Sequence, residues 1–432
     1  MKTKINIGII GFGTVGAGTV KVLTDNRELI KTKLGTEILI KKIADKDIKT
    51  PRPVKVSSEI LTTKPEDILL DPEIDIVIEL IGGYSPAKEF ILQALKNKKH
   101  VVTANKALLA MHGGEIFETA YKNNVNILYE ASVGGGIPVL RALREGLSSN
   151  KINAIYGIIN GTANYILSKM SSENSSFVDV LNEAQEKGYA EKDPSFDIEG
   201  IDSAHKLSIL AYLAYGCFFP FKNIYTEGIS QVTPLDITYA RELGYVIKLL
   251  GIIKNINNRI ELRVHPTMIP IDYLLASVNG VFNGIYISGD PVGDTLFYGR
   301  GAGALPTGSA VVSDVMDIAR HILNRTTSIP EFKWQNEYKE IVPMNEIETS
   351  YYIRMNTLDE SGVLSKIAGI FAKYNISIFS VIQKGKSINN KVNIIMMTHK
   401  SIEKNMRQAI TEIDSLPVVN TKSMIIRVEN RD

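Results

Sequence analysis

The first part of the chain alternates apolar runs with amphipathic stretches. Runs rich in Ile, Val and Leu occur at residues 5–10, 38–44, 74–81, 100–103 and 125–129. They are continuous rather than alternating, which is the pattern of strands buried on both faces of a sheet. Helical patterns lie between several of them, including 86–96, where a proline occupies a plausible first helical position. This order predicts βαβ units and an α/β fold with a doubly wound parallel sheet, the Rossmann arrangement.

The pattern changes after about residue 137. Helical patterns follow Pro138, cover 160–167 and run on beyond Asp202, and shorter alternating runs come after them. These features predict a second, α+β domain. A glycine-rich loop leading into a helix at 299–323 is expected to return to the first domain. The polar stretch at 324–348, which contains the only tryptophan, Trp334, is typical of a linker.

The C-terminal residues form a pattern of their own. Strands are expected at 351–357, 376–383, 392–398 and 423–428, and helices at 363–374 and 402–416. The resulting order, βαββαβ, is the ferredoxin-like arrangement.

Composition narrows the class of protein. The chain has 432 residues, of which 44% are hydrophobic and 22% charged, as in ordinary globular proteins. A net charge of +2 gives no strong field toward nucleic acid or an anionic membrane, so neither is an expected partner. No apolar run approaches the ~18 residues of a membrane-spanning helix. The single cysteine, Cys217, excludes an internal disulfide framework, and a cytoplasmic location is expected.

A glycine-rich motif follows the first predicted strand and opens a predicted helix. Its glycines would allow a tight turn, close approach to a pyrophosphate, and packing of helix on strand. The helix N-terminus would present free N–H groups to the phosphates. The motif predicts a site for NAD(P) formed by Gly11, Phe12, Gly13, Thr14, Val15 and Gly16.

The choice between the two coenzymes stays open. Asp45 follows the second predicted strand and lies 29 residues beyond Gly16, where it would favour the unmodified ribose of NAD. Lys41, Lys42 and Lys46 could instead receive the 2′-phosphate of NADP. All four could also be solvated charges at a strand end.

A charged stretch at 191–206 leads into the apolar helix pattern. If Asp202 opens that helix, it shares one helix face with Lys206. Such a pair is usually a surface ion pair of little consequence. The helix beyond it is apolar on most sides, however, so its first turn would face an enclosed cleft, where desolvation brings the pKa of a lysine closer to neutrality. Both interpretations remain open on the residues alone.

A longer pattern around this pair resembles the signature of the homoserine dehydrogenases. It reads Ala184-x3-Gly188-Tyr189-Ala190-x2-Asp193-Pro194-x2-Asp197-Ile198-x-Gly200-x-Asp202-x3-Lys206. The resemblance extends to GFGTVG at 11–16, TANK at 103–106, EASVGGGIP at 130–138, GTANYIL at 161–167 and the glycine-rich loop at 299–308, and covers about residues 1–330. The C-terminal unit resembles the ACT-type regulatory domain that many members carry.

These features together predict four segments. They are a dinucleotide-binding domain at 1–136, completed by about 300–325; a substrate, catalytic and dimerisation domain at 137–299; a linker at 326–348; and an ACT-type domain at 349–432.

The resemblance implies reversible reduction of L-aspartate 4-semialdehyde to L-homoserine with NAD(P). Lys206 would be the acid/base that protonates the developing alkoxide, and Lys106 the second lysine at the reacting oxygen, next to the cofactor. Asp202 and Glu191 would hold the substrate ammonium group. The residues agree with this division, because hydride transfer needs no protein nucleophile. Asp193, Asp197 and Glu199 are expected to orient the loop.

The resemblance assigns two further groups of residues. Gly188 and Gly303 would lie against the cofactor. A monovalent cation, usually sodium, would be bound by the main-chain carbonyls of Glu130, Val133, Gly135 and Ile137. A plain glycine-rich crossover between domains is the alternative for 130–138.

The C-terminal unit implies regulation. Members of the ACT class bind amino acids at the turn between the first strand and the first helix, here with Asp359 and Gly362, although a simple capping turn is the alternative. We expect feedback inhibition by threonine, loss of that inhibition without loss of activity when 349–432 is deleted, and a homodimer or homotetramer.

Two other functions compete with this interpretation. Another semialdehyde enzyme that uses NAD(P), the phosphorylating kind, needs an activated thiolate, and the apolar surroundings of Cys217 argue against it. A non-catalytic amino-acid sensor would not need the lysines, yet Lys106 and Lys206 are both present.

Overall fold

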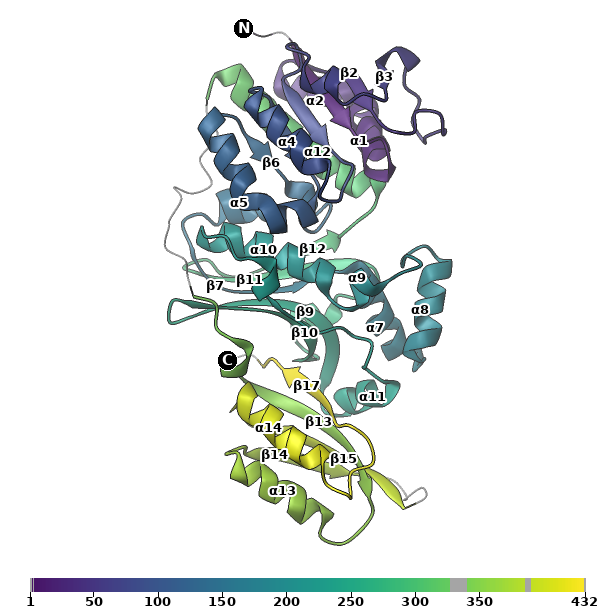
Figure 1. Ribbon diagram of the computed structural model, residues 1–432, viewed down its shortest axis with the longest axis vertical. Helices are drawn as coiled ribbons and strands as arrows, with labels where there is room; N and C mark the ends of the chain where they lie inside the picture. The colour runs from purple at the N-terminus through teal and green to yellow at the C-terminus, as the bar shows by residue number, and fades with distance from the viewer. Residues whose placement is uncertain (1, 3, 327–339, 385–389, 431–432) are drawn as a thin grey trace. The chain divides into compact units, whose positions relative to one another are not determined.

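The computed structural model describes residues 2, 4–326, 340–384 and 390–430. The chain forms two compact units (Figure 1). The first unit comprises Met1–Asn153, Ala204–Asn223 and Phe282–Tyr338, and the second comprises Ala154–Ser203, Ile224–Val281 and Lys339–Asp432. Trp334 lies outside the described residues.

The first unit is built on a six-stranded sheet of order β3-β2-β1-β4-β5-β6. All five strand pairings are parallel, so the predicted doubly wound parallel sheet is confirmed. Its strands are β1 (Lys4–Ile10), β2 (Glu37–Ala44), β3 (Leu61–Thr62), β4 (Ile76–Glu79), β5 (His100–Thr103) and β6 (Ile127–Leu128). The two-residue strand β3 was not predicted, because two residues carry no periodicity.

Helices cover both faces of this sheet (Figure 1). One face packs against α1 (Thr14–Asp25), α2 (Arg27–Leu34) and α12 (Ala304–Asn324), with Ile5, Ile7 and Ile9 fully buried in the shared core. The other face carries α3 (Glu66–Leu69), α4 (Ala87–Lys96) and α5 (Lys106–Asn123). The helix predicted after the glycine motif is α1, which ends at Asp25, and Pro86 precedes its helix rather than opening it.

The glycine-rich loop at 299–323 leads into a helix, as predicted. The hairpin of β11 (Phe282–Asp290) and β12 (Gly293–Arg300) comes before it, and α12 then packs against α1 in the first unit. The helix predicted after Pro138 is a short α6 (Val139–Arg141) continued by a π-helical turn, Ala142–Gly146.

The second unit contains a sheet of order β7-β9-β10-β17-β13-β15-β14. Its strands are β7 (Lys151–Ile158), β9 (Tyr245–Ile256), β10 (Arg259–Pro270), β13 (Glu348–Leu358), β14 (Ile378–Gln383), β15 (Lys391–Thr398) and β17 (Met424–Val428), with β8 (Tyr225–Thr226) beside β10 and β16 (Ser401–Ile402) beside β13. Its helices are α7 (Gly161–Glu173), α8 (Phe177–Glu186), α9 (Ser195–Ile198), α11 (Pro234–Glu242), α13 (Val363–Lys373) and α14 (Glu403–Asp414). The remaining helix, α10 (Ile201–Tyr215), passes from the second unit into the first.

The C-terminal elements follow the predicted order βαββαβ, and they are joined to the rest of the second unit. The last strand, β17, pairs in parallel with β10, with Thr267 opposite Arg427 and Met268 opposite Val428. The stretch expected to be a linker also contacts β10, because the N–H of Ile260 donates to the carbonyl of Glu340 at 2.9 Å. One hydrogen-bonded sheet therefore runs through both parts.

Buried ion pairs lie where β17 pairs with β10. The side chains of Arg263 and Arg427 are almost fully buried. Arg263 donates to Glu429 and to Glu261, and Lys254 reaches Glu429 at 2.6 Å. Burying a charge is costly unless it is paired and hydrogen-bonded, so these groups depend on one another.

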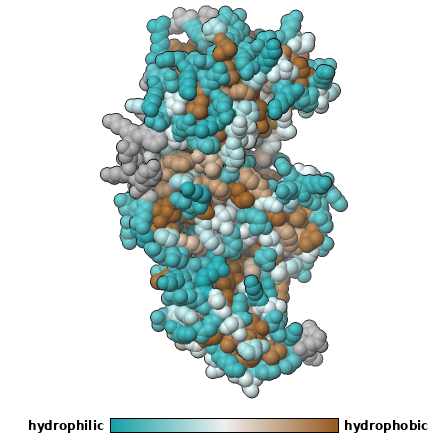
Figure 2. Space-filling view, in the orientation of Figure 1, coloured by the Kyte–Doolittle hydropathy of each residue, from teal (hydrophilic) through white to brown (hydrophobic). Residues whose placement is uncertain are grey.

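On the face that Figure 2 shows, the surface is mostly hydrophilic and carries several hydrophobic groups. Among the described residues, none of the helices combines the length and the apolar character needed to cross a membrane.

Candidate functional site

The glycine turn between β1 and α1 is tightly packed. Gly11 has a φ of +107°, and a Cβ there would meet the backbone of Leu80. A Cβ on Gly16 would overlap the carbonyl of Gly11, whereas Gly13, which precedes α1, has open space around it. Because α1 is 12 residues long, its N-terminus can offer N–H groups to a phosphate above Gly13. The geometry suits the pyrophosphate of a dinucleotide.

Two further glycines allow α1, the helix that follows this turn, to pack closely against α12. Gly18 of α1 and Gly308 of α12 face each other where the helices cross, and a Cβ on either would overlap backbone atoms of the other helix. Sequence reasoning missed them. The available signal was a glycine inside each helix, which costs roughly 1 kcal/mol in the absence of a packing reason. Gly303, with a φ of +118°, immediately precedes α12.

Asp45 lies at the end of β2 and contacts the turn directly. Its carboxylate accepts the N–H of Phe12 and, at 2.8 Å, the N–H of Asp47. Arg52, which the sequence did not single out, donates to the carbonyl of Phe12 at 2.8 Å and lies over its ring. Asp45 thus supports the turn.

Two of the three lysines near Asp45 are paired elsewhere. Lys41 forms ion pairs with Asp71 and Glu73. Lys42 donates to the carbonyl of Glu59 at 2.8 Å, and Lys46 is exposed.

Lys106 begins α5 and is half-buried. Asn105 caps the helix by accepting the N–H of Leu108 at 3.2 Å, and its own N–H donates to the hydroxyl of Thr103 at 3.0 Å. That hydroxyl donates at 2.7 Å to Glu79, a fully buried carboxylate whose pKa is raised by desolvation. A chain of buried hydrogen bonds therefore fixes the backbone from which Lys106 projects.

Asp202 and Lys206 lie one turn apart on α10, and both are buried, with exposed fractions of 2% and 8%. Asn160, which precedes α7, donates from one Nδ2 to Asp202 at 2.9 Å and to Asp197 at 2.7 Å. Its Oδ1 accepts the N–H of Ala163 at 2.8 Å, which fixes the amide orientation. The surface ion-pair interpretation of Asp202 and Lys206 is therefore wrong, because neither side chain is at the surface.

The rest of the charged segment is held by short local contacts. Thr162 donates to Asp197 at 3.0 Å and to the carbonyl of Tyr189 at 2.8 Å. Asp193 accepts the N–H and the hydroxyl of Ser195. Such contacts can hold the loop at Asp193 and Asp197, whereas the Glu199 carboxylate accepts no hydrogen bond from the described residues; the orienting role of the three carboxylates stays a prediction. Sequence reasoning did not identify Asn160 or Thr162 as site residues, although both belong to the segment around GTANYIL.

Glu191 and Gly188 are exposed. Gly188 follows α8 with a φ of +72°, and Glu191 is anchored by its main chain, whose carbonyl accepts Gln185 Nε2 at 3.0 Å. Of the predicted site residues, the glycine turn, Asp45, Lys106, Gly303 and Lys206 lie in the first unit. Gly188, Glu191 and Asp202 lie in the second.

The segment 130–137 turns sharply at two glycines. Gly134 and Gly135 both have positive φ values, and a Cβ on Gly135 would overlap the backbone of Gly301. The carbonyl of Ile137 accepts the N–H of Val139 at 2.8 Å. Among the described residues, no cluster of three or more His, Cys, Asp or Glu side chains could hold a metal ion. A cation here would therefore have to rest on main-chain oxygens such as those of Val133 and Gly135, which a turn of this kind can supply.

Two buried carboxyl groups lie beside this turn. Glu130 accepts the N–H groups of Leu140 and Arg141, and its own N–H donates to Asp314 at 2.8 Å. Burial, together with the charge of Glu130, raises the pKa of Asp314 to about 8.

The turn after β13 is open. Gly362 precedes α13 with a φ of +87° and has free space where a Cβ would stand. Asp359 is exposed, and its N–H donates to the carbonyl of Asn390 at 3.0 Å. An 11-residue helix begins at this turn, so N–H groups are available to an anionic ligand.

Three family models match the chain. "Homoserine dehydrogenase, NAD binding domain" matches residues 11–130, "Homoserine dehydrogenase" matches 138–316 and "ACT domain" matches 351–418.

Whole-chain relatives agree with these matches. Homoserine dehydrogenase of Neisseria gonorrhoeae is 48% identical over 99% of both chains, and that of Helicobacter pylori is 45% identical over 100% of both. The crystal structure of a homoserine dehydrogenase from Thiobacillus denitrificans covers 99% of this chain and 98% of its own, with a TM-score of 0.92 and 47% identity. A hyperthermophilic archaeal homoserine dehydrogenase in complex with NADPH covers 73% of this chain and 97% of its own, with a TM-score of 0.63 and 27% identity.

Proposed function

We propose a role for each site residue on one premise: the chain belongs to the homoserine dehydrogenase family. It is an NAD(P)-dependent oxidoreductase, and the family reaction interconverts L-aspartate 4-semialdehyde and L-homoserine. In the proposal, Lys206 donates the proton that the developing alkoxide takes up during aldehyde reduction, and removes it in the reverse direction. The observation that carries this assignment is the burial of Lys206 one turn after the buried Asp202, within the family signature.

Asp202 and Glu191 are proposed to bind the substrate ammonium group. Asn160 supports this role of Asp202, because it holds one carboxylate oxygen and so fixes the other in place. Glu191 is exposed in this structure, so in the proposal its side chain turns toward the substrate when the ligand binds. Lys106 is the second cation at the reacting oxygen, on a backbone fixed by Asn105 and Thr103.

NAD(P) supplies the hydride chemistry when it is bound. We infer that its pyrophosphate is held by the turn of Gly11, Gly13 and Gly16, with Phe12, Thr14 and Val15 completing the turn, and that Gly188 and Gly303 lie against it. The archaeal relative, whose structure is a complex with NADPH, supports use of the phosphorylated coenzyme. In the proposal, Asp45 would favour the unphosphorylated coenzyme from its position just after β2, so activity has to be measured with both coenzymes.

A monovalent cation, sodium, is proposed at the carbonyls of Glu130, Val133, Gly135 and Ile137. The turn at Gly134 and Gly135 supports it. Because a bound ion stabilises the folded state, the melting temperature should be higher in sodium chloride than in choline chloride at equal ionic strength. Equal melting temperatures would contradict the site.

Regulation and assembly complete the proposal. Threonine is proposed to bind at Asp359 and Gly362 and to inhibit the enzyme. Membership of the family supports the further proposal that the protein is a homodimer or homotetramer and is located in the cytoplasm. The open turn before α13 supports the effector site.

Homoserine-dependent reduction of NAD+ and of NADP+ tests the reaction, the coenzyme and the role of Lys206 together. Lys206→Ala should lower kcat by about 100- to 10,000-fold, the range for loss of a general acid/base. Lys222→Ala, which removes an exposed lysine, is the matched control and should retain activity. Turnover by the Lys206 variant at the rate of this control would overturn the assignment.

A further inference from the structure

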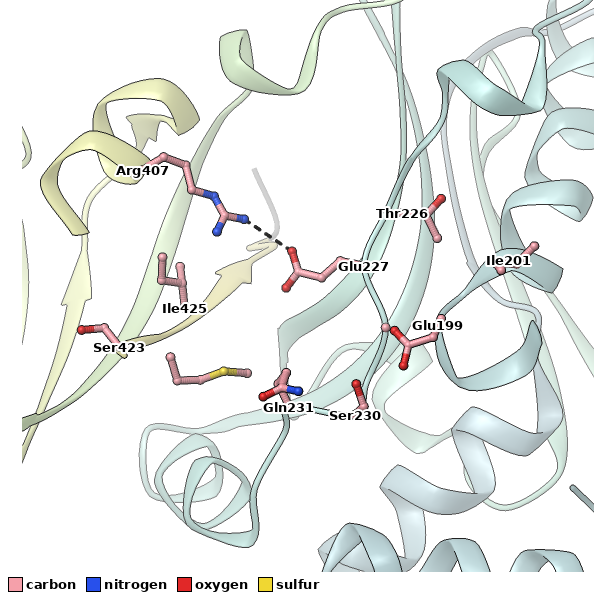
Figure 3. A pocket seen from close by; sticks show the side chains of 11 residues that line it. Glu199, Ile201, Thr226, Glu227, Ser230, Gln231, Arg407, Ser423 and Ile425 are labelled. Atoms are coloured by element: carbon pink, nitrogen blue, oxygen red, sulfur yellow. Dashed lines mark hydrogen bonds and ion pairs between the residues drawn. The ribbon is translucent and has the colours of Figure 1, made fainter. Parts of the chain in front are cut away.

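An open pocket of about 590 Å³ lies in the second unit, next to the segment that carries Asp197 and Asp202. Its walls come from the end of α9, the segment after β8, helix α14 and the start of β17 (Figure 3). It belongs neither to the glycine turn nor to the turn at Asp359. Its volume is in the range of small-molecule sites, which is roughly 300–1,000 Å³.

One wall of the pocket offers a guanidinium group. Arg407 Nε donates to Glu403 at 2.8 Å, and its Nη2 donates to the hydroxyl of Tyr225 at 3.2 Å. Nη1 makes no hydrogen bond to the described part of the chain, and the side chain is 49% exposed. Arg407 is thus held in place on one side and can bind an anion on the other, as a planar guanidinium commonly binds a carboxylate.

Two carboxylates face the same space. Glu227 lies beside Arg407, with 3.5 Å between Oε2 and Nη2, and it also accepts the hydroxyl of Tyr225 and a bond from Arg427. Glu199 comes from the opposite wall (Figure 3) and accepts no hydrogen bond from any described residue. The two walls therefore differ: one carries a cation and an anion side by side, and the other carries an anion alone.

The charges of the pocket do not cancel. Two arginines, Arg407 and Arg427, form ion pairs with the carboxylates of Glu403 and Glu227. Because Glu199 adds a third carboxylate, the group has one net negative charge. A neutral amino acid would leave Glu199 without a counter-ion. Three apolar side chains also line the pocket: those of Ile201, Met424 and Ile425.

We propose that this pocket binds an L-α-amino acid whose side chain is an alkyl chain ending in a second ammonium group. The α-carboxylate binds Arg407, the α-ammonium binds Glu227, and the terminal ammonium binds Glu199. The alkyl chain lies on Ile201, Met424 and Ile425. The proposal concerns binding, and it does not depend on the roles assigned to Lys206 and Asp202.

The pocket is connected to the segment that carries Asp202. The N–H of Ile229 donates to the carbonyl of Ile198 at 2.9 Å, and a Cβ on Gly228 would overlap the carboxylate of Glu199. The segment after β8 and the end of α9 therefore pack without a gap, and Glu199 lies between Asp197 and Asp202 in the chain.

Isothermal titration calorimetry on the full-length protein tests the proposal with four probes. They are L-lysine, L-norleucine, which lacks the terminal ammonium, 6-aminohexanoate, which lacks the α-ammonium, and cadaverine, which lacks the carboxylate. L-Lysine should bind once per chain, and each of the other three roughly tenfold or more weakly, because each leaves a charged group of the pocket unpaired. Equal binding of L-lysine and L-norleucine, or no heat with L-lysine at 20 mM, would overturn the proposal.

Variants locate the ligand. Glu199→Gln should weaken L-lysine binding about tenfold and leave L-norleucine unaffected, and Arg407→Lys should weaken both. Asp272→Asn and Lys404→Gln remove exposed charges outside the pocket and should change neither. If L-lysine binding survives Glu199→Gln but is lost in Asp359→Asn, the ligand occupies the turn after β13 and the proposal is wrong. Lys206→Ala should bind L-lysine like the unaltered protein, so a failed catalytic assignment is distinguishable from a failed pocket.

Discussion

Asn160 holds Asp202 by a 2.9 Å hydrogen bond from the same amide nitrogen that reaches Asp197. The amide is an uncharged bridge between two carboxylates, and its orientation is set by the N–H of Ala163. The two carboxylates are thus held close together by one shared donor, and the position of Asp202, proposed above to bind the substrate ammonium group, depends on this bridge.

Asn160→Asp isolates this bridge. Aspartate keeps an oxygen to cap α7 but removes the donor and adds a third negative charge beside Asp197 and Asp202. Loss of a buried hydrogen bond to a charged group costs about 1.5–3 kcal/mol, so kcat/KM should fall roughly 10- to 100-fold. The loss should lie mainly in KM, measured with aspartate semialdehyde.

Asp179→Asn is the matched control for a helix-capping position, because the side chain of Asp179 forms a hydrogen bond with Ser176 at the exposed start of α8 and with no other side chain in the described part of the chain. It should leave KM unchanged. If Asn160→Asp lowers kcat with an unaltered KM, the bridge does not act through substrate binding.

Gly308→Ala should destabilise the first unit. The added methyl group would overlap the backbone of α1 at Gly18, and overpacking of this kind costs typically about 1–3 kcal/mol. Gly369→Ala is the control, since Gly369 is also in a helix but has nothing within 4 Å of a Cβ. That variant should be more stable by about 0.5–1 kcal/mol. Urea denaturation followed by circular dichroism measures both, and equal midpoints would contradict the close packing of α1 on α12.

Asp314→Asn should change how stability depends on pH. The folded-state pKa of Asp314 is about 8, above its ordinary value of 3.8. A raised pKa means that the folded protein holds the proton more tightly than the unfolded chain does. The stabilising effect is therefore complete below about pH 4 and is lost as the pH rises toward 8 and beyond. Asparagine keeps an oxygen for the N–H of Glu130 without an ionisable proton.

Thermal unfolding of both proteins between pH 5 and 9 provides the test. The variant should gain stability relative to the unaltered protein as the pH rises, whereas Asp272→Asn, at an exposed position, should show a constant difference. Parallel pH profiles for the unaltered protein and the Asp314 variant would mean that Asp314 is ionised in the folded state.

The threonine response is best tested by a point variant. From the sequence alone, deletion of 349–432 should leave activity intact. The structure predicts otherwise, because the deletion removes β17 from the edge of β10 and takes Glu429 from the buried Arg263. Breaking a buried ion pair by removing one partner costs about 3–5 kcal/mol, and Arg263 would keep only Glu261 of its two carboxylate partners. The truncated chain should therefore be unstable.

Asp359→Asn keeps the sheet complete. It should raise the threonine concentration needed for half-inhibition by tenfold or more while basal activity is retained, measured by homoserine oxidation. Glu360→Gln, which neutralises the next exposed carboxylate, is the control and should respond to threonine like the unaltered protein. An identical response of the Asp359 variant would exclude this turn as the effector site.

Local patterns carried much of the fold. The strand at 100–103 and the order βαββαβ were predictable because period and length are properties of short windows. The pairing of β17 with β10 was not, since it joins residues more than 150 positions apart and no local signal encodes the partner of a strand. The same limit applies to Gly18 and Gly308, whose meeting depends on where α12 returns.

The site divides in the same way. Long and specific sequence patterns contain Lys206, Asp202 and the glycine turn, so these site residues could be predicted from residue type and spacing. Asn160 could not be assigned from the sequence, because an asparagine before a helix is equally typical of a simple cap. Its second role, as a hydrogen-bond donor to Asp197 and Asp202, arises only when folding brings these two carboxylates close to Asn160.

The parallel contact of β10 with β17 sets an order of events during synthesis. The ribosome releases β10 long before Val428, so the part of β10 that pairs with β17, at Thr267 and Met268, stays uncovered until residue 428 has emerged. Such an edge recruits strands from other chains. Premature termination between the two strands should therefore yield insoluble product, because β17 is the strand that closes this part of the edge of β10.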